Sequence, residues 1–356
     1  MIFDQLVTDA TELLKKLIST PSFSKEEAGT ALLICQLFDS YDIPYKTVGH
    51  NVYVQNKHYD ITKPTILLNS HHDTVKPNKG YTLDPFDPLV KDGKLYGLGS
   101  NDAGGCLVSL VAVFIHYYEL ENLTHNIILA ATAEEEISGV NGIELALSHL
   151  GEIAFAIVGE PTQMQMAVAE RGLMVIDCTS TGRAGHAARN EGENALYKAL
   201  DDINWIRNYK FEKVSALLGD TRLTVTIIET ENKQHNVVPA TCKFVTDARV
   251  NELYAFDEIL KILEANLVSD FKPRSTRMKS SSIALSHPLV KAGIELGRSY
   301  YGSPTTSDKA LMSFPALKIG PGDSARSHTA DEYIFLNEIE EGIKLYIQLL
   351  DKLLIE

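Results

Sequence analysis

The sequence predicts an α/β fold with a mainly parallel central sheet flanked by helices, into which a smaller α+β domain is inserted. Three observations support this prediction. Short apolar runs alternate with amphipathic segments between about residues 65 and 160, a pattern typical of parallel strands joined by helices. Longer strand-like runs and two helical segments fill residues 170–275. At 356 residues, the chain also exceeds what one hydrophobic core usually organises. We therefore expect a main domain over residues 1–169 and 276–356, and an inserted domain over residues 170–275.

The elements of the main domain follow from the spacing of its apolar residues. The first segment, MIFDQLVTDATELLKKL, has apolar residues at helical spacing, so we expect a helix. Next come the strand TILLNS, a helix over 103–118, the strand NIILAATA, a helix over 142–150 and the strand IAFAIVGE. After the insertion we expect a helix over 288–301, the strand PALKIG and a closing helix over 337–354.

The inserted segment has a different order of elements. We expect the strand GLMVIDCTST, a helix over 194–209, the strands RLTVTIIE and TCKFVTDARV, and a helix over 255–267. This order is typical of an antiparallel α+β unit. The polar stretch SDFKPRSTRMKSSS contains Pro273, and we interpret it as the linker that returns to the main domain.

Composition excludes several classes of protein. The formal net charge is -14 and the pI is near 5.3, so nucleic acids and anionic membranes would be repelled. No apolar stretch approaches the roughly 18 to 20 residues that a membrane span needs. The N-terminus lacks the blocks of a signal peptide, and the four cysteines form no CxxC pair. We expect a soluble cytoplasmic protein with reduced thiols.

Polar residues gather where the predicted strands stop. Because ligands bind at the carboxyl ends of strands in parallel sheets, these residues could converge on one site. They are His71 and Asp73, Asp102 in GLGSNDAGG, Glu134–Glu136, Glu160, and His328 in GPGDSARSHTADEY. Each also has an ordinary structural explanation, such as helix capping by Asp102 or solvation of three adjacent glutamates. Taken together, two histidines and several acids are the ligand set that a pair of divalent cations needs.

The chain resembles the M20 family of metallopeptidases and deacylases through motifs that run along nearly its whole length. The motifs are, in order, SHHDTV, GLGSNDAGG, TAEEEISG, VGEPT, AERG, TGRAGHAAR, HNVVPA with DAR, and GPGDSARSHTADEY. The resemblance implies a zinc-peptidase-like catalytic domain and an inserted lid and dimerisation domain. It also implies two divalent metal ions, with Zn favoured over Co or Mn. His71, Asp102 and Glu160 would hold one, Glu136 and His328 the other, and Asp102 would bridge both.

The same resemblance implies roles for further residues. Glu135 would be the general base, and Asp73 would orient His71. His186, in the lid of a partner subunit, would stabilise the oxyanion, which requires a homodimer. Asn236 and Arg249 would hold the substrate, since a guanidinium is suited to grip an α-carboxylate. For His186 and Arg249, a turn residue and a structural ion pair are the alternatives.

Some positions depart from the family pattern. Ser70 stands where glycine is usual before the metal histidine, Leu98 where arginine is usual, Gly104 where lysine is usual, and Arg189 where proline is usual. None is an implied metal ligand, so the departures concern loop shape and subfamily.

The substrate implied by the resemblance is a small N-acyl amino acid. The ERG motif, the GPG loop and the length look most like the branch of acetylornithine deacetylase and succinyl-diaminopimelate desuccinylase. This implies a zinc-dependent amidohydrolase of arginine or lysine biosynthesis that acts on N-acetylornithine. N-acetyl- or N-succinyl-citrulline, N-succinyl-diaminopimelate and N-acetyl-lysine stay open as substrates.

Other classes of protein stay open at this stage. A dipeptidase or carboxypeptidase would use the same metal site. A metal-binding scaffold or regulatory dimer without catalysis, and a structural α/β protein with solvated acids, are the non-enzymatic alternatives.

Overall fold

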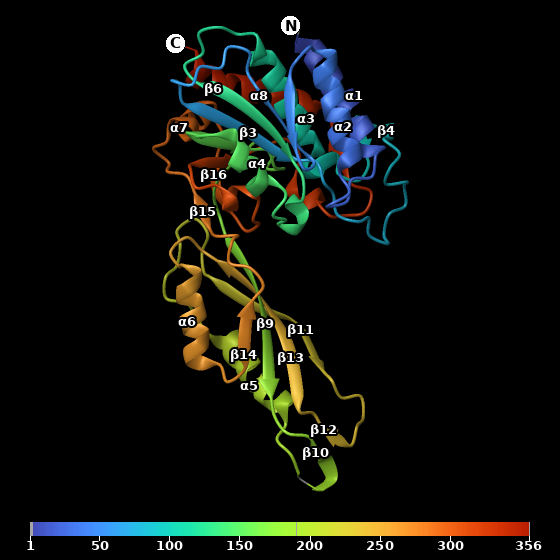
Figure 1. The fold of residues 1–356 in the computed structure, drawn as a ribbon, viewed down its shortest axis with the longest axis vertical. Coiled ribbons are helices and arrows are strands. Elements are labelled where there is room, and N and C mark those ends of the chain that lie inside the picture. The colour runs from blue at the N-terminus through green and yellow to red at the C-terminus, as the bar shows by residue number, and fades with distance from the viewer. Residues whose placement is uncertain (1–2, 190, 356) are drawn as a thin grey trace. The chain divides into compact units, whose positions relative to one another are not determined.

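The computed structural model describes residues 3–189 and 191–355. The chain folds into two compact units, each described below by itself (Figure 1). The first unit comprises Met1–Val168, Ser282–Tyr301 and Ser307–Glu356. The second comprises Ala169–Ser281 and Gly302–Thr306.

The first unit is built on a large mixed sheet. Its strands lie in the order β1 (Tyr45–Val48), β2 (Asn51–Gln55), β6 (Asn126–Thr132), β3 (Thr65–His71), β7 (Phe155–Val158), β17 (Ala316–Lys318) and β8 (Met166–Glu170). The four central strands β6, β3, β7 and β17 are parallel to one another. Antiparallel pairs flank them, with β1 and β2 on one side and β8 on the other. The mainly parallel sheet expected from the sequence is therefore confirmed.

Helices cover both faces of this sheet, as expected for strands that are buried on both faces. They are α1 (Phe3–Ile18), α2 (Ala28–Ser40), α3 (Gly105–Tyr118), α4 (Ile143–Leu150), α7 (Pro288–Glu295) and α8 (Leu336–Leu354). On one face, α4 packs its Ile143 and Ala146 against Leu67 and Ile128 of the strands. On the other face lies α3, which is almost wholly buried and contacts α1 and α8 (Figure 1).

A small three-stranded sheet lies beside the loops of the first unit. Its strands are β18 (Tyr333–Phe335), β5 (Lys94–Tyr96) and β4 (Val90–Lys91), in that order. All its pairs are antiparallel. It joins the segment that precedes Asp102 to the segment that follows His328.

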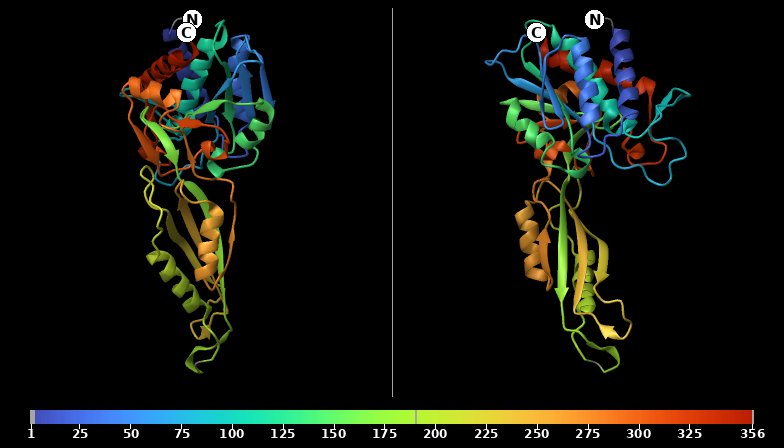
Figure 2. Two further views of the ribbon diagram at one scale, coloured as in Figure 1. Left: turned by 90° about the vertical axis from the view of Figure 1, so that its left-hand side faces the viewer. Right: turned by 45° about the vertical axis from the view of Figure 1, so that its right-hand side comes forward.

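The second unit is an antiparallel α+β structure. Its sheet has the order β11 (Arg222–Thr230), β13 (Thr241–Val250), β9 (Gly172–Thr181) and β14 (Asp270–Pro273). Helices α5 (Ala195–Asn208) and α6 (Phe256–Asn266) share one core with the sheet (Figure 2). Alternate residues of β9, namely Met174, Ile176 and Cys178, enter this core, so the two helices cover one face. A short ribbon of β10 (Gly185–His186) and β12 (Val237–Val238) completes the unit.

Two sequence-based expectations are wrong. The stretch SDFKPRSTRMKSSS is not only a linker, because its residues 270–273 form the edge strand β14 against β9. Pro273 is the last residue of that strand, where a missing N–H is tolerated. The helix expected over 288–301 ends at Glu295, and Gly297 follows with φ of 76°, a conformation that stops a helix. Residues 300–303 then form the strand β16.

Candidate metal centre

Three neighbouring parallel strands of the first unit deliver polar residues to one edge of the sheet. His71 is the last residue of β3, and it pairs in register with Thr132, the last residue of β6. Glu135 and Glu136 follow β6 in a short turn, and Glu160 follows β7. Because the carboxyl ends of parallel strands meet at one edge, these side chains lie close together.

Two loops add further side chains to this edge. Asp102 lies in the tight segment Ser100–Gly104 just before α3, and His328 lies in the loop before β18. The His71 Nε2 atom is 3.4 Å from one oxygen of Asp102, and the His328 Nε2 atom is 3.7 Å from the other. Asp102 therefore lies between the two imidazole rings, which is the position of a bridging carboxylate.

Each of the remaining carboxylates lies near one of the two histidines. Glu160 and Glu135 face the His71 Nε2 atom at 3.8 Å and 3.9 Å. Glu136 faces the His328 Nε2 atom at 3.0 Å. Two sets, His71 with Asp102 and Glu136, and His71 with Glu135 and Glu160, have donor atoms that all lie within 4.8 Å of one another. The structure thus brings together all five side chains that the sequence suggested as ligands, together with Glu135.

Asp73 links this cluster to the turn after β6. The His71 Nδ1 atom is 3.0 Å from the backbone oxygen of Asp73 and 3.4 Å from its carboxylate. The carboxylate accepts hydrogen bonds from the backbone N–H groups of Glu135 at 3.0 Å and Glu136 at 3.2 Å, and from the Ser24 hydroxyl at 2.7 Å. Asp73 thus fixes both the histidine ring and the backbone that carries two of the glutamates.

The pKa values in the cluster reflect an excess of buried acids. Burial, and then the negative charge of Glu160, raises the pKa of Glu135 well above its usual range. A hydrogen bond with Glu136 raises the pKa of His328 to about 9. Burial alone would lower the pKa of His71, but the nearby carboxylates of Asp102 and Asp73 outweigh burial and raise this pKa well above 6.5. Divalent cations would offset this concentration of negative charge.

The residues present fit divalent metals. The His71 Nε2 atom is buried and has no hydrogen-bond partner among residues 3–189 and 191–355. A buried polar atom without a partner is costly, so this nitrogen needs a ligand. Imidazole nitrogens and carboxylate oxygens are donors that Zn, Co and Mn all accept, whereas no cysteine belongs to the two donor sets found in the described residues.

Glu134 takes no part in the cluster. Its carboxylate accepts from the side-chain amide of Asn141 at 2.9 Å, and its backbone has φ of 54°. Gly139 lies so close that a Cβ there would meet the Glu134 carboxylate at 2.0 Å. Glu134 therefore shapes the turn after β6 and belongs to neither of the two donor sets.

His186, Asn236 and Arg249 belong to the second unit. His186 is exposed in β10 and pairs in register with Val237, the residue after Asn236, so these two candidates lie side by side. Arg249 is near the far end of β13, and its guanidinium makes two hydrogen bonds to Asp247, at 2.8 and 3.1 Å. The second unit therefore places Arg249 apart from His186 and Asn236, and their roles toward substrate stay predictions.

Sequence reasoning missed two residues that support the cluster. Ser24 donates to Asp73, and the buried Glu332 accepts backbone N–H groups around Asp102. Burial, and then the charge of Asp102, raises the pKa of Glu332 to about 8. Glu332 lies four residues after the candidate ligand His328 in the same motif, and this position was the sign in the sequence that it could lie near the site. Ser24 offered none.

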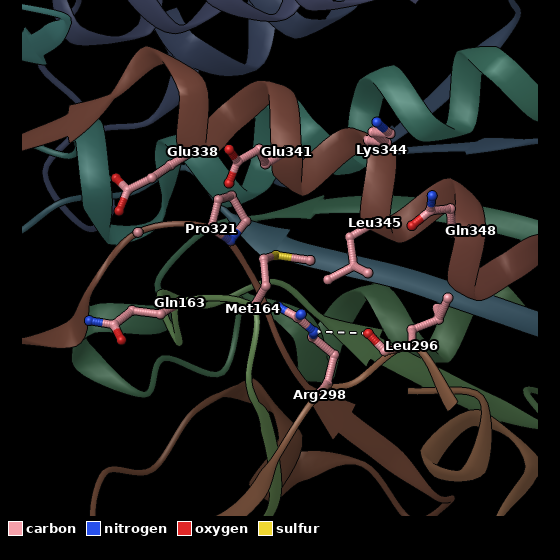
Figure 3. Close-up of a pocket in the computed structure, with 11 residues that line it drawn as sticks. Gln163, Met164, Leu296, Arg298, Pro321, Glu338, Glu341, Lys344, Leu345 and Gln348 are labelled. Atoms are coloured by element: carbon pink, nitrogen blue, oxygen red, sulfur yellow. Dashed lines mark hydrogen bonds between the residues drawn. The ribbon is translucent and has the colours of Figure 1, made fainter. Parts of the chain in front are cut away.

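A separate cavity of about 440 Å³ lies between α8 and the loops that contain Met164 and Arg298 (Figure 3). Glu338, Glu341 and Leu345 of α8 form one wall, and the Arg298 side chain rises toward Met164 from the other. None of the metal-binding candidates lines it. It is therefore distinct from the candidate metal centre.

Together, the fold and this cluster define the class of protein: an α/β domain with histidines and carboxylates that could hold divalent cations at the carboxyl edge of its sheet. The sequence of residues 67–352 matches the family described as Peptidase family M20/M25/M40. The chain belongs to this family, whose members are hydrolases acting on amide bonds.

Named relatives agree with this assignment. The chain is 24% identical over 372 residues to a succinyl-diaminopimelate desuccinylase of Wolbachia pipientis subsp. Culex pipiens (strain wPip), covering 95% of this chain and 92% of that protein. The crystal structure of aminopeptidase PepT from Bacillus cereus has a TM-score of 0.78 at 18% identity, with 99% of each chain covered. YXEP of Bacillus subtilis, described as a dinuclear metal binding peptidase of the M20 family, has a TM-score of 0.73 at 13% identity, with 98% of each chain covered.

No helix within the described part of the chain is long and apolar enough to cross a membrane.

Proposed function

We propose that this protein is a two-metal hydrolase that removes an acyl group from the nitrogen of an amino acid. One observation carries the proposal: the buried His71 Nε2 atom has no hydrogen-bond partner in residues 3–189 and 191–355, yet carboxylate oxygens surround it. His71, Asp102 and Glu160 would hold one cation. Asp102, Glu136 and His328 would hold the other, with Zn favoured in both sites over Co or Mn.

The chemistry divides between the cations and Glu135. When bound, the two cations would acidify the attacking water and polarise the scissile carbonyl. Glu135 would take the proton from that water and return it to the departing amine, so that the amide C–N bond breaks and a free amine and a carboxylate form. The bonds from Asp73 to the backbone of Glu135 and Glu136 would hold the base in place.

The substrate is proposed as an N-acyl amino acid of a biosynthetic pathway in the cytoplasm. The name of the Wolbachia relative makes N-succinyl-diaminopimelate, and hence lysine biosynthesis, the first substrate to test. N-acetylornithine, and hence arginine biosynthesis, and the acylated citrullines use the same catalytic groups and come next. A peptidase is the second candidate function, because the fold also matches aminopeptidase PepT.

A substrate panel tests this proposal. Protein stripped with EDTA would be reloaded with Zn, Co or Mn and assayed for amine release from the four acyl amino acids and from dipeptides with a free α-amine. We expect metal-dependent hydrolysis of at least one acyl amino acid. Faster hydrolysis of the dipeptides would favour the peptidase, and failure to bind any of the three metals tightly would refute the two-metal site.

We further propose a homodimer in which His186 acts on the metal site of the partner subunit. Mixing two inactive variants tests this directly. In a heterodimer of His186→Ala with Glu135→Gln, the subunit that keeps Glu135 would receive His186 from its partner. We expect mixing to restore about a quarter of the wild-type activity, since half of the dimers would be mixed and each would have one intact site. No restoration in mixed dimers verified by mass, or a fully active monomer in sedimentation, would contradict the proposal.

A further inference from the structure

Glu332 is a buried carboxylate beside the candidate metal centre, and it has no part in the proposed catalysis. It is 2% exposed and lies directly before β18, four residues after His328. A buried carboxylate needs hydrogen-bond donors to replace its lost water. The donors that it finds belong to the loop that carries Asp102.

Three backbone N–H groups of that loop point at the one carboxylate. Gly99 donates to one oxygen at 3.1 Å, while Asn101 and Asp102 donate to the other at 2.8 and 2.9 Å. They converge because the loop is folded tightly around Gly99, which has φ of 75°. Successive N–H groups in such a turn form a concave anion-binding nest, and Glu332 fills it.

This nest fixes the backbone from which the Asp102 side chain reaches both histidines. The Asp102 oxygens lie 3.4 Å from His71 and 3.7 Å from His328, so a small shift of the loop would change both distances together. Glu332 lies in the same segment as His328, whereas its hydrogen-bond donor Asn101 lies 231 positions before Glu332 in the sequence. One carboxylate thus ties together the two loops that complete the second cation site.

Asn101 strengthens the same connection. Its side-chain amide donates to the backbone oxygen of Asp323 at 3.0 Å and accepts from the backbone N–H of Asp323 at 3.0 Å. The loop of Asp102 is therefore bonded at two points, Asp323 and Glu332, to the segment that contains His328. Without Glu332, three N–H groups of this loop would lose their acceptor in a buried place.

We propose that Glu332 is a positioning residue that sets the affinity for the metal ions by holding the loop of Asp102 in place. This inference rests on the proposed two-metal site. Residues that hydrogen-bond to metal ligands and orient them contribute to metal binding, and their loss typically lowers metal affinity by about 10–100-fold.

The test compares metal binding by four proteins, namely the wild type, two Glu332 variants and one control variant. Zn affinity would be measured by competition with a chromophoric chelator, and coordination geometry by the visible spectrum of the Co-loaded protein. Glu332→Gln replaces one acceptor oxygen with an amide that cannot accept an N–H group. Glu332→Asp keeps both carboxylate oxygens but withdraws them by one methylene. We expect about 10–100-fold weaker Zn binding for both variants and an altered Co spectrum.

Asp331→Asn is the matched control. Asp331 is the adjacent residue, and its carboxylate also accepts three hydrogen bonds, but from Thr82 and Leu83 and not from the loop of Asp102. We expect it to lower thermal stability while leaving Zn affinity within about twofold of wild type. Wild-type Zn affinity in either Glu332 variant, or an equal loss in Asp331→Asn, would overturn the inference. If the wild-type protein binds no metal at all, it is the proposed function that fails.

Discussion

The change Asp73→Asn tests whether the Asp73 carboxylate stabilises the fold around the candidate metal centre and the binding of metal there. Asp73 is fully buried, and its two oxygens face the N–H groups of Glu135 and Glu136 and the hydroxyl of Ser24. Asparagine has nearly the same shape but offers one oxygen and one NH₂ group. Whichever way the amide turns, the N–H group of Glu135 or that of Glu136 then faces another donor.

The expected magnitude follows from these contacts. One buried N–H group without an acceptor costs about 1–3 kcal/mol. The hydrogen bonds that remain are made to a neutral acceptor, which reduces the stabilisation from each by roughly 0.5–1 kcal/mol. We therefore expect Asp73→Asn to destabilise the metal-free protein by about 2–5 kcal/mol and to weaken Zn binding by about 10–100-fold, since His71 loses its anionic neighbour.

Urea unfolding in EDTA and Zn competition measure the two effects separately. Glu119→Gln is the control, because Glu119 pairs with Lys57 at 2.7 Å but is 66% exposed, and such pairs contribute at most about 1 kcal/mol. Unchanged Zn affinity in Asp73→Asn would show that this carboxylate does not support the metal site. A loss of stability no larger than that of the control would refute the hydrogen-bond argument.

Three further changes have defined outcomes. Glu135→Gln should keep its metal, measured by elemental analysis, but lose about 10²–10⁴-fold in turnover, and retained activity would remove Glu135 from the role of base. Gly104→Ala places a Cβ 2.4 Å from the backbone oxygen of Gly99, so it should destabilise the protein by about 1–3 kcal/mol in urea, and a wild-type midpoint would contradict the close approach. Burial lowers the pKa of His287 below its usual 6.5, and its Nδ1 atom accepts the N–H of Leu289 at 3.2 Å. Its contribution to stability is therefore complete above about pH 6.5 and is lost as the pH falls below that value. His287→Asn keeps an acceptor without titrating, so its melting temperature should fall less than that of wild type between pH 7 and 5, and parallel curves would disprove the link.

The sequence predicted the parts of this fold that depend on periodicity. The continuous apolar runs of β3 and β6 predicted buried parallel strands, and the positions of His71 and Glu160 at strand ends predicted that they would meet. The strand over residues 270–273 was not predicted because it is a short edge strand. Its pairing partner β9 lies far away in the sequence, so no local pattern indicates the pairing. The position of Glu332 near His328 was visible in the sequence, but its contacts could not be predicted, because its partners are backbone N–H groups about 230 positions away.

The insertion has a consequence for how the chain is made. β17 lies between β7 and β8 in the first sheet, yet it is synthesised after the whole second unit. Until it emerges from the ribosome, β7 has an unpaired edge, and the apolar helix α3 lacks its contact with α8. An exposed strand edge beside an uncovered apolar helix is prone to aggregate and to be held by chaperones. Chains that stop before residue 316 should therefore accumulate as insoluble protein.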